Sequence, residues 1–316
     1  MTILADVRSR TRGWHRPSAL AAATLGVVAV LCVAAMLLDQ RTLEGAPIWA
    51  KPFKFAVSGA LYFLTWSWLV SLLPRFRRTA NGLTNFLVLI FAAEYVLLVV
   101  QAARGRASHF NNATALDAGI YSVMAKMIIG LWVATFALTV LVMVTKVEDR
   151  ASFWAVRAGA VVSLVGISLG VLMTSPTARQ LAQWQTGGKP DMVGAHTVGL
   201  ADGGPGLPIL GWSTVAGDLR IPHFVGMHAL QALPLLALAL AALAPRFARL
   251  RDDVAGTVRA RLVLVGAAGY AGLTALVTWQ ALRAQSIVHP DALTLGAFAV
   301  LVAGAGLGSW AAVRVR

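Results

Sequence analysis

The sequence predicts an all-α polytopic membrane protein with eight transmembrane helices. Of its 316 residues, 58% are hydrophobic and only 13% are charged, which is too little charge for the surface of a water-soluble domain of this length. Apolar runs of about 20 residues, the length that crosses a bilayer core as a helix, recur along the chain. The basic residues fall in short clusters between these runs, as orientation signals do.

The net charge of +14 would suit a nucleic-acid partner if it stood alone. Because the basic clusters alternate with apolar runs, we expect the lipid bilayer as the partner and no nucleic acid. The single cysteine, Cys32, lies inside the first apolar run. This excludes an intrachain disulfide and a thiolate metal site.

The first apolar run follows a tail that carries Arg8, Arg10, Arg12 and Arg16. A secretory signal would have a shorter apolar core and a small-residue cleavage site, so we interpret this run as a retained helix with a cytoplasmic N-terminus. The eight predicted spans are 18–38, 55–73, 83–102, 118–144, 153–174, 223–244, 260–282 and 292–312. An even number of spans places both termini in the cytoplasm of a bacterial-type plasma (inner) membrane protein, and most of the 27 basic residues then lie in inner segments.

A weak internal repeat divides the chain into two four-helix halves, 1–150 and 151–316. Three short motifs recur in the same order in both halves. They are Pro74-Arg-Phe-Arg-Arg with Pro245-Arg-Phe-Ala-Arg, Gln101-Ala-Ala-Arg with Gln280-Ala-Leu-Arg, and Ala115-Leu-Asp-Ala-Gly with Ala292-Leu-Thr-Leu-Gly. Since each half has an even number of spans, the halves would be parallel repeats related by an axis along the membrane normal.

One long connection, 175–222, belongs to the second half and is predicted to lie on the extracytoplasmic side. Its glycines and prolines, as in the segment that starts at Asp202, prevent long helices and make tight turns. A loop this long without regular structure is as a rule either functional or disordered. Trp184 and Trp212 favour the ordered alternative, in which the segment forms a lid over the outer mouth of the bundle.

The histidines are the most informative residues, because five of the six lie on the predicted outer side. These five are His109, His196, His223, His228 and His289. Two of them belong to the segment 220–231, where the polar connection meets an apolar helix. His223 and His228 are about 140° apart on a regular helix, so they could hold one ion together only if His223 lies in an irregular stretch after Pro222.

A third ligand could come from His109, which follows the third span. Imidazole nitrogens with a nearby carboxylate would suit zinc, iron or copper, so His109, His223 and His228 form a candidate metal site. For a cofactor such as haem b, the candidate binding residues are His228, His223 and Gln101. The alternative is that these histidines are interfacial residues hydrogen-bonded to loop carbonyls.

Two charged residues are predicted to lie deeper in the membrane. Glu94 and Lys126 are each about 12 Å below the outer end of their spans, and Gln231 reaches a similar depth. A charge at this level is costly unless it faces the bundle and finds a partner, which predicts a Glu94–Lys126 ion pair. Glu94, Lys126 and Gln231 are therefore the candidate catalytic residues, although an ion pair of this kind can also be purely structural.

Eight spans in two four-helix halves, with histidines near the outer surface, resemble the layout of haem A synthase. In that family the haem ligands are histidines inside paired helices of each half. Here the predicted spans 55–73 and 118–144 contain no histidine, so the first half departs from the pattern. The resemblance is one of architecture, and no residue role is carried over from it.

Three functions fit these patterns. The first is a membrane enzyme or redox protein with a transition metal or haem b at the outer face, which acts on a small molecule from the outer side or the membrane. The second is a small-molecule or proton-coupled transporter that uses the Glu94–Lys126 pair. The third is a non-catalytic assembly subunit. The sequence contains no phosphate-binding loop, nucleophile elbow or H-E-x-x-H motif.

Overall fold

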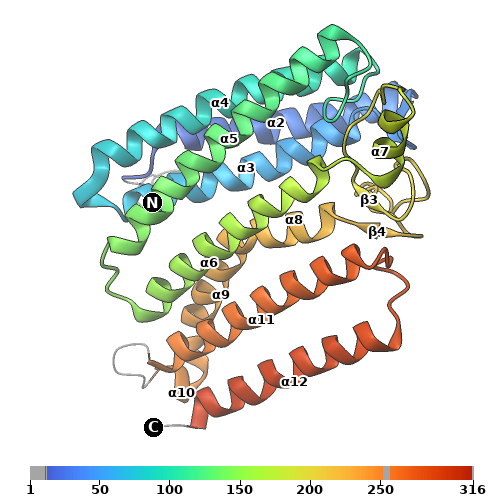
Figure 1. Cartoon of the computed structure of the whole chain (residues 1–316). Coiled ribbons are helices and arrows are strands. Elements are labelled where there is room, and N and C mark those ends of the chain that lie inside the picture. The colour runs from blue at the N-terminus through green and yellow to red at the C-terminus, as the bar shows by residue number, and fades with distance from the viewer. Residues whose placement is uncertain (1–10, 12, 252–256, 315–316) are drawn as a thin grey trace.

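The computed structural model describes residues 11, 13–251 and 257–314, and it shows an all-α membrane protein. Eight of the described helices are long and apolar enough to cross a membrane, which confirms the predicted fold class. In Figure 1 the two chain ends lie at one end of the helices, and the long connection lies at the other. The basic residues Arg8, Arg10 and Arg12 lie outside the described residues.

The first half contains four long helices that follow one another in space as in sequence. Helices α2 and α3 are joined by a small antiparallel hairpin, β1 with β2, and a short 3-10 helix, η1, precedes α4. The bounds are α2 (Arg16–Leu38), β1 (Thr42–Leu43), β2 (Ala46–Pro47), α3 (Ala50–Ser71), η1 (Pro74–Phe76), α4 (Arg77–Ala103) and α5 (Ala115–Val144).

The second half is less regular, because its first span leads into the long connection. That connection carries a short helix, α7, and two short antiparallel strands, β3 and β4. The bounds are α6 (Arg150–Ser168), η2 (Leu169–Thr174), α7 (Ala178–Gln185), β3 (Thr197–Val198), β4 (Gly217–Asp218), α8 (Arg220–Met227), α9 (Ala229–Leu243), η3 (Ala244–Arg246), α10 (Ala248–Arg251), α11 (Thr257–Leu282) and α12 (Ala292–Arg314). The parallel repeat between the halves stays a prediction.

Among the differences from the predicted span boundaries, two matter for the site. The second span begins at Ala50, not at residue 55, so Lys51 and Lys54 belong to the first turns of α3. The predicted sixth span, 223–244, is divided into α8 and α9, which meet at His228. A hydropathy pattern locates the apolar part of a helix. It therefore leaves a polar first turn outside the predicted span.

Two helix starts are set by capping side chains that are visible in the sequence. Thr114 accepts a hydrogen bond from the backbone N–H of Asp117 at the start of α5, and Asp149 accepts one from Ser152 at the start of α6. These side chains satisfy backbone donors that have no partner inside the helix. The caps fix where the loops end and the apolar helices begin.

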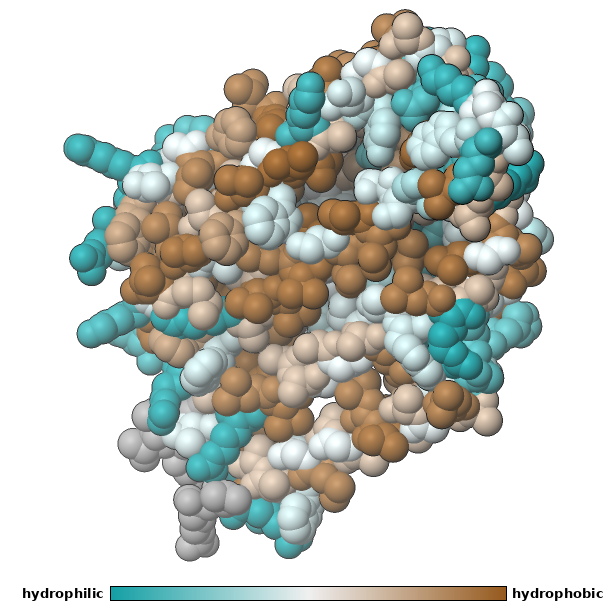
Figure 2. Space-filling view, viewed as in Figure 1, coloured by the Kyte–Doolittle hydropathy of each residue, from teal (hydrophilic) through white to brown (hydrophobic). Residues whose placement is uncertain are grey.

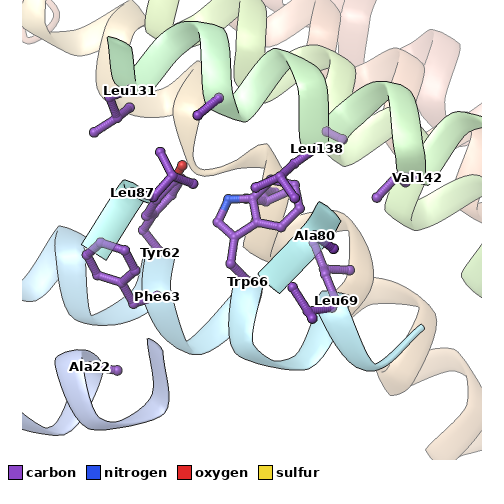
Figure 3. Packing of buried hydrophobic residues seen from close by; sticks show 14 of the residues in the cluster. Ala22, Tyr62, Phe63, Trp66, Leu69, Ala80, Leu87, Leu131, Leu138 and Val142 are labelled. Carbon is purple, nitrogen blue, oxygen red and sulfur yellow. The ribbon is translucent and has the colours of Figure 1, made fainter. Parts of the chain in front are cut away.

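The largest buried cluster surrounds α3. Phe63, Trp66 and Leu69 of this helix are almost completely buried, and they pack against α2, α4 and α5 (Figure 3). Helix α3 also contacts α9, so it lies between the two groups of helices. The visible face in Figure 2 is hydrophobic across its middle and hydrophilic at both ends, as expected for a protein embedded in a bilayer.

Candidate functional site

A polar site lies at the end of the bundle that carries the long connection, which we call the outer end. Its residues come from the start of α3, from α4, from the loop between α4 and α5, and from the 175–222 segment. Charged and hydrogen-bonding side chains are gathered here between apolar helices. Each of them needs a partner from the protein, from water or from a ligand.

Glu94 is the most unusual residue of the site. Its side chain is 1% exposed, and neither carboxyl oxygen has a hydrogen-bond partner among the described residues. Nε2 of His109 lies 3.9 Å from Glu94 Oε1, too far for a hydrogen bond. A buried carboxyl group without partners is costly, which marks this position as one where another molecule belongs.

His109 is held on its other side by Lys51 and Ser108. Its Nδ1 lies 3.3 Å from Lys51 Nζ and 2.9 Å from Ser108 Oγ. An ammonium group can only donate, so Nδ1 accepts from Lys51 and the proton of a neutral ring is on Nε2. That N–H then faces the Glu94 carboxyl group.

The ring of His109 also belongs to an aromatic cluster that connects the loop to the lid. It packs against Phe55, Phe110 and Tyr121, with ring centroids 6.1, 6.1 and 6.4 Å away. Phe110 in turn packs edge-to-face on His196 at 5.2 Å. Burial, followed by the positive charge of Lys51, holds the pKa of His109 well below its ordinary value.

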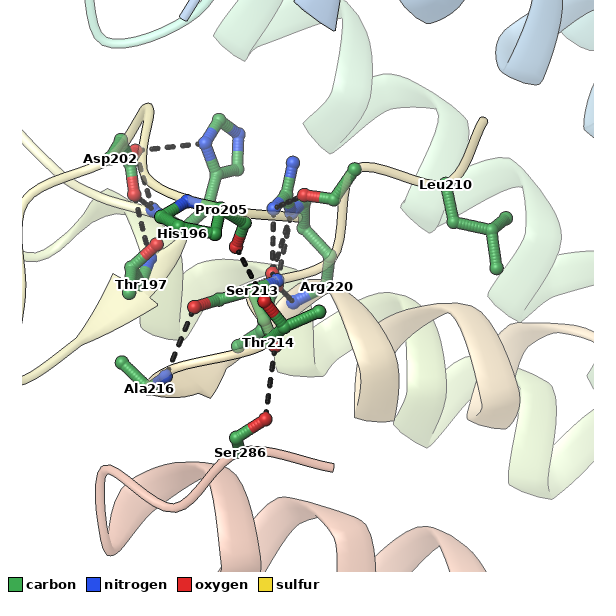
Figure 4. A network of polar contacts seen from close by, with 12 residues as sticks. His196, Thr197, Asp202, Pro205, Leu210, Ser213, Thr214, Ala216, Arg220 and Ser286 are labelled. Carbon is green, nitrogen blue, oxygen red and sulfur yellow. Dashed lines mark hydrogen bonds and ion pairs between the residues drawn. The ribbon is translucent and has the colours of Figure 1, made fainter. Parts of the chain in front are cut away.

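The 175–222 segment is an ordered lid that is fixed by partly buried ion pairs (Figure 4). His196 Nδ1 lies 2.9 Å from Asp202 Oδ2. Burial alone would raise the pKa of Asp202, but the hydrogen bond and charge of His196 hold that pKa well below its usual range. Arg220 donates to both oxygens of Asp218, a carboxylate that is completely buried.

The lid is attached to both groups of helices. Lys54 of α3 donates a hydrogen bond of 2.7 Å to the carbonyl of Leu210, and Arg220 donates to the next carbonyl, that of Gly211, at 2.5 Å. On the other side, Ser286 donates to the carbonyl of Ser213 at 3.3 Å (Figure 4). The lid is thus positioned above the start of α3.

A cavity of about 330 Å³ opens beside this cluster. Tyr121 is shared between the two, because it lines the cavity and its ring also packs on His109. The cavity is lined by residues of the α4–α5 loop, of α5 and of the lid, namely Asn112, Tyr121, Thr174, Trp184, Lys189, Pro190 and Val193. A small polar molecule could reach the neighbourhood of His109 from here.

His228 and Gln231, which the sequence singled out, lie together at the break between α8 and α9. His228 Nδ1 is 3.3 Å from Gln231 Oε1, and its Nε2 is 3.1 Å from Ser58 Oγ of α3. His223 donates from Nδ1 to the carbonyl of Gly166, 2.8 Å away. Burial lowers the pKa of both histidines from its ordinary value.

The structure does not assemble the predicted metal site from His109, His223 and His228. His109 contacts Lys51 and His228 contacts Ser58, both of α3, whereas His223 contacts Gly166 of α6. No group of three His, Cys, Asp or Glu residues in the described ranges is placed to hold an ion. Gln101, predicted to contact a cofactor with His223 and His228, instead donates to Asp117 and accepts from Arg104 in a network between α4 and α5. In the described structure Gln101 therefore has different partners from His223 and His228.

The predicted Glu94–Lys126 ion pair is also absent from the described structure. Lys126 is exposed on α5, whereas Glu94 is buried next to His109. Helix α5 is apolar on every side, so its sequence pattern does not say which face is turned inward. A lysine near the end of a span can reach the interface along its own aliphatic chain, without an internal partner.

Sequence reasoning missed Lys51, Lys54 and Ser58, which complete the site. Their spacing of three and four residues places them on one face of a helix, and this pattern is visible in the sequence. The predicted start of the second span at residue 55 leaves Lys51 and Lys54 outside the helix, so the pattern does not stand out. A lysine pair in the first turn of an apolar helix, with a serine one turn further on, is the signal that identifies these residues.

The low pKa of His109 makes stability depend on pH. In the unfolded chain the ring takes up a proton near its ordinary value of about 6.5, whereas the folded protein resists this. We therefore expect the unfolding temperature to fall as the pH is lowered from 7.5 to 5. Each unit of pKa difference corresponds to about 1.4 kcal/mol once the pH is below both values.

Thermal unfolding in detergent across this pH range measures the effect. His109→Gln removes the titrating ring. We therefore expect the unfolding temperature to change less steeply with pH below pH 6.5, and the pH dependence that remains to come from His223 and His228. The exposed His289 provides the matched control, and His289→Gln should leave the slope as it is. An unchanged slope in His109→Gln would contradict the assignment.

No family model, no curated protein and no solved structure matches this chain.

Proposed function

We propose that the protein is a membrane enzyme that acts by proton transfer on a small polar substrate at the outer end of the bundle. The observation that carries this proposal is the buried, unpartnered carboxyl group of Glu94, 3.9 Å from His109 Nε2. A substrate atom that moved between these two groups could exchange a proton with each of them. The lid would keep bulk water away from this exchange.

The roles follow from the partners of each group. Glu94 acts as the base, because its oxygens are free to accept a proton. His109 acts as the donor, since Lys51 fixes the tautomer with the proton on Nε2. Lys51 and Lys54 add positive charge near any negative charge that develops on the substrate. Substrate access is through the cavity that Tyr121 lines.

A metal or haem is not part of this proposal. Two of the histidines considered for a metal have protein partners: His228 contacts Ser58 and Gln231, and His223 contacts the carbonyl of Gly166. The proposed chemistry uses carboxyl, imidazole and ammonium groups. The outer orientation rests on the positive-inside pattern of the basic residues.

The test uses purified protein in liposomes, incubated with a cell extract of lipids and small metabolites, and untargeted mass spectrometry to find species that are consumed. Glu94→Gln keeps the shape of the side chain but cannot act as a base, so we expect consumption to fall by about 100-fold or more. Lys126→Gln removes an equally deep but exposed charge and should retain wild-type activity.

The proposal fails if no species is consumed by the wild type, or if folded Glu94→Gln is as active as the wild type. The first outcome would favour an assembly subunit, in which the same polar groups are purely structural.

A further inference from the structure

One face of α3 carries polar side chains far below the site. Lys51, Lys54, Ser58, Tyr62 and Trp66 are spaced by three or four residues, which places them on one side of the helix over four turns. The lower part of this face is turned inward, because Tyr62 is 8% and Trp66 0% exposed. We call these five residues the polar face of α3.

Partners from other helices continue this face. Ser58 lies 3.1 Å from His228, which in turn contacts Gln231 of α9. One turn further inward, the hydroxyls of Tyr62 and Thr135 of α5 are 2.7 Å apart. Each of these hydroxyl and imidazole groups can accept one proton and donate another. Together they form a series of relay groups between α3, α5 and α9.

Three residues of α3 and α4 have buried polar atoms without a hydrogen-bond partner in the described part of the chain. They are Glu94 with both carboxyl oxygens, Trp66 with Nε1 and Asn81 with Oδ1. The indole nitrogen of Trp66 lies on the side that faces Tyr62 (Figure 3). Buried polar groups in proteins are as a rule satisfied by ordered water when protein partners are missing.

These unpartnered groups lie at widely separated depths. Trp66 is fifteen positions below Lys51 on α3, and Asn81 is thirteen positions from Glu94 on the antiparallel α4; each separation is about 20 Å at the helical rise. Glu94 is therefore near the outer end, and Trp66 and Asn81 are near the inner end. Relay groups and unsatisfied groups together cover most of the distance across the bundle.

We propose that a file of single water molecules runs along the polar face of α3, from Glu94 past Ser58 and Tyr62 to Trp66 and Asn81, and conducts protons across the membrane. Protons move by hops in which each water, hydroxyl or imidazole accepts one proton and passes on another. Phe63, Leu87 and Leu138 are almost completely buried in the same cluster as Tyr62 and Trp66. The inference goes beyond the outer site and does not depend on turnover there.

The experiment measures proton flux in liposomes that contain the purified wild-type protein and an internal pH-sensitive dye. A potassium diffusion potential set with valinomycin drives protons inward. We expect flux well above that of empty liposomes. Tyr62→Phe removes one relay hydroxyl and keeps the ring, and Trp66→Phe removes the unpartnered N–H; each should reduce the flux several-fold.

Thr65→Val is the matched control. Thr65 lies on the same helix, but its hydroxyl donates to the carbonyl of Leu61 of its own helix and lies outside the buried polar face. Its variant should conduct like the wild type. A solvent isotope effect in heavy water, present in the wild type and in Thr65→Val, would mark proton hopping as the process that limits flux.

Two results would overturn the inference. In the first, the wild-type protein conducts no more protons than empty liposomes do. In the second, folded Tyr62→Phe and folded Trp66→Phe both conduct protons as fast as the wild-type protein. Substrate consumption is measured in liposomes without an applied potential or pH gradient. If the wild type conducts protons but consumes no substrate, the result counts against the enzyme proposal alone. If Tyr62→Phe loses flux but retains consumption, the result supports the proton path alone.

Discussion

Asp218→Asn is expected to lower the free energy of unfolding by about 3–5 kcal/mol, the usual cost of leaving one partner of a buried ion pair uncompensated. Asp218 is completely buried and accepts hydrogen bonds from the side chain of Arg220 and from the backbone N–H of Ser213. Asparagine keeps the shape but not the charge, so the guanidinium of Arg220 remains partly buried without its counter-ion. Unfolding in mixed detergent micelles measures the loss.

The structure offers a matched control for this change. Arg283 and Asp291 form an ion pair of similar length, 2.5 Å, between α11 and α12, but Asp291 is 39% exposed. Water and salt screen such a pair, so Asp291→Asn should have little measurable effect on unfolding. Limited proteolysis should also cleave the lid faster in Asp218→Asn than in the wild type, and no faster in Asp291→Asn. Equal stabilities of the two variants would show that the lid pair does not hold the lid.

Gly166→Ala is expected to cost about 3 kcal/mol, the upper part of the usual range for overpacking. A Cβ at this position would lie 2.1 Å from the backbone nitrogen of Met227 and 2.2 Å from the carbonyl carbon of Gly226. Both are backbone atoms, so they cannot rotate away as a side chain would. Helices α6 and α8 would have to separate.

The separation should also be felt at the site, because the carbonyl of Gly166 is the partner of His223. We therefore expect Gly166→Ala to raise the accessibility of His223 to a histidine-modifying reagent, in addition to its lower unfolding temperature. Gly119→Ala on α5 is the control: its Cβ would meet nothing within 4 Å, and alanine favours helix over glycine. Wild-type stability in Gly166→Ala would contradict the close contact of these helices.

The sequence predicted the number of spans and the place of the lid, because both are local properties. A run of about 20 apolar residues is long enough to cross a bilayer wherever its neighbours lie, and a segment rich in glycine and proline cannot continue a helix. It also placed Glu94, His109, His228 and Gln231 toward the outer end, and the described structure has all four there. Depth along a helix follows from counting residues.

The sequence did not predict which of these residues would meet. Lys126 and Glu94 have similar depths, yet only Glu94 faces the interior, where His109 and Lys51 lie. In the membrane the apolar surface of a helix can face either lipid or another helix, so a hydrophobic pattern that normally marks the buried face carries little information about rotation. Only the packing of the helices decides that angle.

By itself, the sequence determined that this chain is a multi-pass membrane protein with a polar segment between its fifth and sixth spans, since length and hydropathy are properties of each segment alone. The tertiary structure alone decided that Lys51, His109 and Glu94 share one site, that His223 and His228 are engaged elsewhere, and that the polar face of α3 is turned inward. The physical reason is that a contact between side chains depends on how far two helices are rotated and how closely they approach, and these are set by packing against partners distant in the chain.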